Sequence, residues 1–142
     1  MSFIYYNPNP EHKDDIDCVV RAISKIENIS WEDAYLGICT QGYFMHLIPI
    51  RNKVWSTYLL NHGYHYYDIL DTCPNCYTVR DFCLDHPKGR YLLAVLVNYI
   101  DQFQAMDSGK HLSGNHVVTV INGNYYDAWD SGGEVPIAYW TK

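Results

Sequence analysis

The stretch that decides the fold is Asn115-His116-Val117-Val118-Thr119-Val120-Ile121-Asn122-Gly123-Asn124-Tyr125-Tyr126-Asp127-Ala128-Trp129-Asp130. Two runs rich in β-branched and aromatic residues, 116–121 and 124–129, flank the dipeptide Asn122-Gly123. An Asn-Gly dipeptide between two such runs is one of the stronger signals for a β-hairpin. The pattern therefore predicts two antiparallel strands joined by a tight turn.

Further strands are expected around this hairpin. Residues 91–97, Tyr-Leu-Leu-Ala-Val-Leu-Val, form a continuous apolar run of the kind found in a central strand covered on both faces. Residues 64–69 and 136–140 predict two more strands. The segment 98–115 has few apolar anchors and predicts a long surface loop, and long loops in compact domains often carry function.

The first two thirds of the chain have helical periodicity. A stripe of apolar residues at helical spacing predicts a helix that ends at Asn28 or Ile29. The residues of this stripe are Val19, Ala22, Ile23 and Ile26. The N-cap candidates of this helix are Asp14, Asp15 and Asp17. Cys18 then falls in its first turn.

Three further helices are predicted from residues that cap a helix N-terminus and from Gly or Pro residues that end a helix. Ser30, with Asp33 three residues later, begins one that should stop by Gly42. A helix over 50–62 should close at Gly63, and a short one should begin at Thr78 and end at Pro87. The expected fold is α+β, with N-terminal helices packed on a C-terminal antiparallel sheet in one domain over 1–142.

Composition excludes several classes of protein. The 142 residues carry 10 Lys and Arg against 16 Asp and Glu, a net charge of −6, which argues against nucleic acid as the main partner. The sequence contains neither an apolar run of about 18 residues nor an export signal. We therefore expect a cytoplasmic location and no membrane partner. The five cysteines are an odd number and are expected to be thiols in a reducing compartment.

Cys18 is the candidate nucleophile. A thiol attacks as the thiolate, and a helix N-terminus favours the thiolate through its partial positive charge. The thiolate also needs an imidazole, which a carboxylate usually orients. If the hairpin is centred near Gly123, Asp130 lies across from His116, and a shift of one residue would bring Asp127 to the face of His116 instead.

These residues resemble the papain-like cysteine peptidase superfamily. The resemblance is carried by Asp17-Cys18-Val19-Val20-Arg21-Ala22, by Asn115-His116-Val117-Val118, and by Tyr126-Asp127-Ala128-Trp129-Asp130. It is closest to small bacterial or phage-borne members related to the peptidases that trim bacteriocin leaders. It implies that a helix bearing the nucleophile packs on an antiparallel sheet, and that acyl transfer proceeds through a thioester.

The resemblance also implies roles for individual residues. Cys18 matches the nucleophile, His116 the general base and acid, and Asp130 or Asp127 the third member. Relatives often place an oxyanion-donating Gln about six residues before the nucleophile. That position is His12 here, so the candidate donors are His12, Asn9 and the backbone N–H of Cys18. No cofactor or metal is implied, and the expected partner is a protein or peptide substrate.

Other interpretations remain open on the sequence. Cys18 could be a small apolar core residue, since cysteine is often buried. The spacing of Cys73, Cys76, Cys83 and His86 is compatible with a zinc site, and the first two could be a redox pair. A chain that keeps the fold but lacks an oxyanion donor could be a catalytically inactive, host-directed binding protein.

Overall fold

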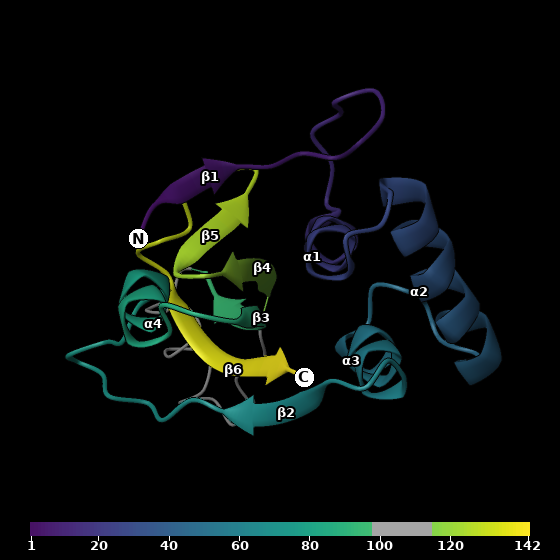
Figure 1. Ribbon diagram of the computed structural model, residues 1–142. Coiled ribbons are helices and arrows are strands. Elements are labelled where there is room, and N and C mark those ends of the chain that lie inside the picture. The colour runs from purple at the N-terminus through teal and green to yellow at the C-terminus, as the bar shows by residue number, and fades with distance from the viewer. Residues whose placement is uncertain (98–114) are drawn as a thin grey trace.

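The computed structural model describes residues 1–97 and 115–142, which contain four helices and six strands (Figure 1). The strands are β1 (Phe3–Tyr5), β2 (His65–Asp68), β3 (Arg90–Leu96), β4 (His116–Ile121), β5 (Asn124–Asp127) and β6 (Val135–Thr141). The helices are α1 (Cys18–Glu27), α2 (Trp31–Met45), α3 (Asn52–Asn61) and α4 (Val79–Asp85). The α+β class is confirmed. The predicted loop at 98–115 lies, except for Asn115, outside the described residues.

All six strands form one sheet in the order β1-β5-β4-β3-β6-β2. The predicted hairpin is present, with Ile121 paired to Asn124 across the turn at Asn122 and Gly123. The expectation of a purely antiparallel sheet is wrong at one edge, where β1 pairs with β5 in parallel. Strand β1 has three residues, Phe3–Tyr5, which are too few to show an alternating pattern, and β1 was therefore not predicted.

The central strand β3 is buried from both sides, as its apolar run predicted. Leu92 and Ala94 belong to the core beneath α1, α2 and α3, whereas Leu93 and Val95 belong to the core beneath α4. This alternation follows from the two-residue period of a strand. The sheet therefore separates α1, α2 and α3 from α4, as Figure 1 shows.

The helix boundaries agree with the predicted caps except at the end of α2. The Ser30 side chain accepts the Asp33 backbone N–H at 3.0 Å, and Thr78 and Asp81 form a capping box. The prediction that α2 stops by Gly42 is wrong, because the helix continues to Met45. Gly42 instead allows close approach of the following segment, since a Cβ atom there would lie 2.8 Å from the Leu47 carbonyl oxygen.

The four helices of the described segments are not suited to crossing a bilayer. None of them combines enough length with enough apolar character to span a membrane. The longest, α2, has 15 residues, whereas a spanning helix needs about 20.

Candidate active site

Cys18 is the first residue of α1 and lies where the helix leaves its N–H groups unpaired. The first intrahelical bond runs from the Arg21 N–H to the Asp17 carbonyl oxygen. Asp17 occupies the N-cap position, but its side chain makes no capping hydrogen bond. In the described part of the chain the N–H groups of Cys18 and its two successors therefore have no acceptor, and they are available to an oxyanion.

His116 begins β4 and forms a buried pair with Asp127 at the end of β5. The distance from His116 Nε2 to Asp127 Oδ2 is 2.5 Å, and the two side chains are 8% and 1% exposed. The Ser131 hydroxyl donates to the same carboxylate oxygen at 2.7 Å. The Ala128 backbone N–H donates to the other oxygen at 2.7 Å. These bonds fix the carboxylate, and the carboxylate fixes the imidazole ring.

The other side of the imidazole interacts with Cys18. Burial alone lowers the pKa of His116, but hydrogen bonds to Asp127 and Cys18 and the negative charges of these groups raise it to about 9. Because Nε2 is bonded to Asp127, Nδ1 is the ring nitrogen left for the thiol. The structure thus aligns a thiol, an imidazole and a carboxylate in the order that nucleophilic catalysis requires.

The prediction that Asp130 faces His116 is wrong, and Asp127 is the residue that does. The turn consists of Asn122 and Gly123 alone, so its centre lies earlier than the position that the prediction assumed. Asp130 instead accepts hydrogen bonds from the Tyr125 hydroxyl at 2.6 Å and from Arg80 at 3.1 Å. Its pKa is lowered by the Tyr125 bond and by the Gly132 backbone N–H.

A second buried carboxylate joins this network through Arg21, a connection that the sequence analysis missed. Arg21 binds Asp17, the N-cap residue of its own helix, and its Nη2 lies 3.4 Å from Asp127 Oδ1. The Trp31 indole N–H donates to the other oxygen of Asp17 at 2.9 Å. All three charged residues are buried. The i, i+4 spacing of Asp17 and Arg21 was the available signal for their pairing.

The two side-chain candidates for the oxyanion hole lie elsewhere. Asn9 is buried in the connection between β1 and α1, where its Oδ1 accepts the Glu11 N–H at 3.0 Å. His12 is exposed in the same connection. Neither residue lines the two hollows that contain Cys18. Of the predicted donors, the backbone N–H of Cys18 is the one that lies at the candidate nucleophile.

Cys18 and His116 lie at the junction of two hollows. The larger one, of about 580 Å³, extends from Cys18 toward α2 and the segment that precedes α3. The second, of about 430 Å³, extends toward Ala128 and Trp129. The Trp129 ring lies against the His116 ring, with centroids 5.0 Å apart. A substrate can therefore reach the thiol from two sides.

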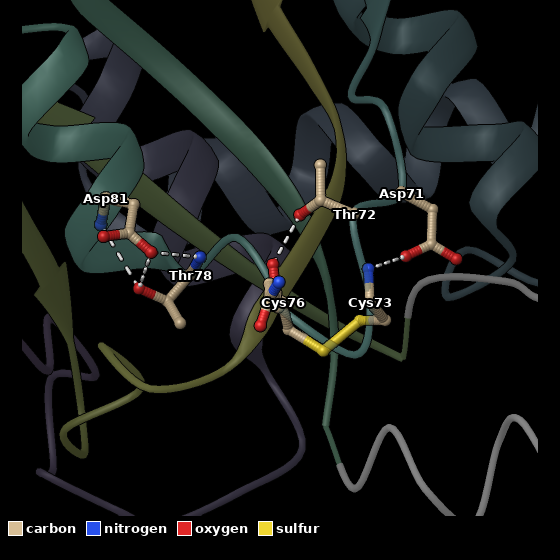
Figure 2. Close-up of a disulfide and its surroundings, with 7 residues drawn as sticks. Asp71, Thr72, Cys73, Cys76, Thr78 and Asp81 are labelled. Carbon is tan, nitrogen blue, oxygen red and sulfur yellow. Dashed lines mark hydrogen bonds between the residues drawn. A yellow bond between two sulfur atoms is a disulfide. The ribbon is translucent and has the colours of Figure 1, made fainter.

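The remaining cysteines do not form the zinc site that the sequence left open. Cys73 and Cys76 form a disulfide in the connection between β2 and α4, close to the Thr78 cap (Figure 2). The expectation that all five cysteines are thiols is therefore wrong for this pair, and a disulfide has no thiolate to donate to zinc. The short Cys-x-x-Cys spacing was the signal for it.

Cys83 and His86 belong to the packing of α4. Cys83 is 1% exposed, and burial raises the pKa of its thiol to about 11. The His86 ring stacks on Phe82 at 3.9 Å between centroids. Cys39 is a half-buried free thiol on α2. These contacts favour a structural role for Cys83 and His86.

Comparison with known proteins adds no further constraint. No family model, no curated protein and no solved structure matches the chain. The geometry around Cys18 is therefore the feature that bears on function.

Proposed function

We propose that this protein is a cysteine hydrolase of the papain-like type that cleaves an amide bond in a protein or peptide. The observation that carries the proposal is the line from the half-buried Cys18 to the buried pair of His116 and Asp127, in which the imidazole interacts with the thiol on one side and with a carboxylate 2.5 Å away on the other. The helix N-terminus beside the sulfur supports the same chemistry.

The reaction follows from the roles of these groups. The Cys18 thiolate attacks the amide carbonyl, and the oxyanion forms beside the unpaired N–H groups at the start of α1. The C–N bond breaks as the His116 imidazolium gives its proton to the leaving amine, which produces a thioester. His116 then takes a proton from water, the water attacks the thioester, and the acid and the Cys18 thiol are released.

Site-resolved alkylation with iodoacetamide tests this proposal. At pH 6.5 we expect Cys18 to react at least about tenfold faster than Cys39, because both line the same hollow but only Cys18 interacts with an imidazolium. His116→Ala should remove most of this advantage at pH 6.5 and leave the Cys18 rate at pH 10 unchanged. Equal rates for the two thiols at pH 6.5 in the wild type would contradict the proposal.

A further inference from the structure

The corner between α2 and α3 exposes four large apolar side chains. Tyr43 and Phe44 in the last turn of α2 are 76% and 73% exposed. Ile48 and Ile50 in the connection that follows are 62% and 73% exposed. In Figure 1 the last turn of α2 is the part of the helical layer farthest from the sheet. An exposed apolar patch of this kind marks a surface that binds a partner or a membrane.

Hydrogen bonds of the backbone hold this corner in a defined shape. The Leu47 N–H donates to the Gly42 carbonyl oxygen at 3.0 Å, and His46 adopts the left-handed conformation at the end of α2. The Arg51 N–H donates to the Ile48 carbonyl oxygen at 3.1 Å and closes the turn before α3. The apolar side chains of the corner are therefore presented by a folded, hydrogen-bonded segment.

The corner carries positive charge. Residues 34–67 contain no Asp or Glu, although the chain has 16 of them, and the same segment contains Arg51 and Lys53. Both cations are exposed, and neither forms an ion pair within residues 1–97 and 115–142. Asp15 lines the same hollow as Ile50, so two cations stand against one carboxylate at this corner.

The acidic start of α2 lies too far away to cancel this charge. Asp33 precedes Phe44 by 11 residues, which is roughly 16 Å along the helix axis. At about 0.1 M salt, charges on the surface are largely screened beyond roughly 10 Å. A negatively charged surface that touches the corner therefore meets mainly Arg51 and Lys53.

We propose that this corner binds the surface of an anionic lipid bilayer. The two aromatic rings and the two isoleucines enter the interface, where aromatic side chains are favoured. Arg51 and Lys53 then face the anionic headgroups. Such binding needs no helix that spans the membrane, and it does not depend on the proposed hydrolase activity. The expectation of no membrane partner came from the lack of a spanning segment alone.

A second copy of the chain fits the same corner less well. In a symmetric dimer the corner of one copy meets the corner of the other. Arg51 and Lys53 of each copy would then lie beside those of the other, and residues 34–67 offer no carboxylate to pair with them. A bilayer that contains anionic lipid supplies the missing negative charge.

Co-sedimentation with vesicles tests the proposal. The full chain is mixed at pH 7.4 and 0.1 M NaCl with vesicles of phosphatidylcholine alone, or of phosphatidylcholine and phosphatidylglycerol at a 7:3 ratio. We expect binding at least about tenfold tighter with the anionic vesicles, because each Lys or Arg at such a surface strengthens binding roughly fivefold. Raising NaCl to 0.5 M should remove most of this difference.

Matched variants locate the contact. Phe44→Ser should weaken binding to the anionic vesicles about tenfold, and Lys53→Gln should weaken it roughly fivefold. Leu84→Ser and Lys88→Gln are the controls. Leu84 is 61% exposed on α4, Lys88 is exposed just after this helix, and the sheet separates α4 from α2 and α3. Both controls should bind as the wild type does.

Three results would overturn the proposal. The first is equal binding, or none, to the two kinds of vesicle, and the second is Phe44→Ser that binds as tightly as the wild type. The third is a loss in Leu84→Ser as large as that in Phe44→Ser. If light scattering shows a dimer that Phe44→Ser dissociates, and vesicle binding is absent, the corner is instead an interface between two copies.

Discussion

Arg21 Nη2 lies 3.4 Å from Asp127 Oδ1, so an ion pair joins the helix that carries Cys18 to the strand that carries Asp127, the partner of His116. Cys18 and Arg21 lie one turn apart on α1. Asp127, in turn, holds the His116 ring at 2.5 Å. The separation of thiol and imidazole is thereby fixed by charged side chains as well as by packing of α1 on β4.

Replacement of Arg21 by Met should destabilise the protein by about 3–5 kcal/mol, because it leaves two buried carboxylates without their shared cation. The double variant Asp17→Asn with Arg21→Met should lower the free energy of unfolding by less than the sum of the two single changes, since it loses one buried charge of each sign. Urea unfolding of the four proteins at pH 7 measures this coupling. Strict additivity would show that Arg21 does not balance these charges.

Asp127→Asn should reduce the rate of Cys18 alkylation at pH 6.5 at least about tenfold, because an amide does not stabilise the imidazolium as a carboxylate does. Asp130→Asn is the matched control, three residues away and bonded to Tyr125 and Arg80 instead. It should leave the rate unchanged. Equal losses in both variants would contradict the assignment of Asp127 to His116.

His116 should make stability depend on pH. Its pKa is raised to about 9 in the folded protein from an ordinary value near 6.5, so its stabilising contribution is complete below pH 6.5 and is lost as the pH rises toward 9. The free energy of unfolding of the wild type should fall between pH 6.5 and 9.5 by about 1–3 kcal/mol more than that of His116→Gln. Parallel pH profiles for the two proteins would refute this expectation.

Thiol titration should distinguish the disulfide from the three free cysteines. In denaturant and without reductant, we expect three reactive thiols per chain, rising to five after reduction. The double variant Cys73→Ser and Cys76→Ser should lose at most about 2 kcal/mol of stability, since the loop that the bond closes is short. Its Cys18 reactivity should equal that of the wild type, because neither cysteine lines the hollows at Cys18.

Much of the fold was predictable because local signals and tertiary packing agree. The apolar run of β3 predicted a strand covered on both faces, and the Asn122-Gly123 dipeptide predicted the hairpin. Two features differ from what the local signals predicted. Phe3–Tyr5 becomes a strand only by pairing with the distant β5. α2 passes Gly42 and ends at the cap residue His46, which adopts the left-handed conformation, and the Leu47 N–H then bonds to the Gly42 carbonyl oxygen.

The candidate site was predictable in its residue types more than in its pairing. The positions of Cys18 at the start of a helix and of His116 at the start of a strand could be predicted from helix and strand signals. The choice between Asp127 and Asp130 depended on the register of one hairpin, and a shift of one residue changes the face of a side chain. The pairing of Arg21 with Asp127 could not be predicted, because it needs the packing of α1 against β5.

Cys18 and His116 are far apart along the chain, and β5 follows His116. During synthesis the cysteine emerges from the ribosome well before the histidine and the carboxylate that would activate it. Until β4 and β5 have joined the sheet, Cys18 has no imidazole beside it and reacts as an ordinary thiol. If the chain has the proposed hydrolase activity, the nascent chain is therefore latent, and that activity can begin only when folding is complete.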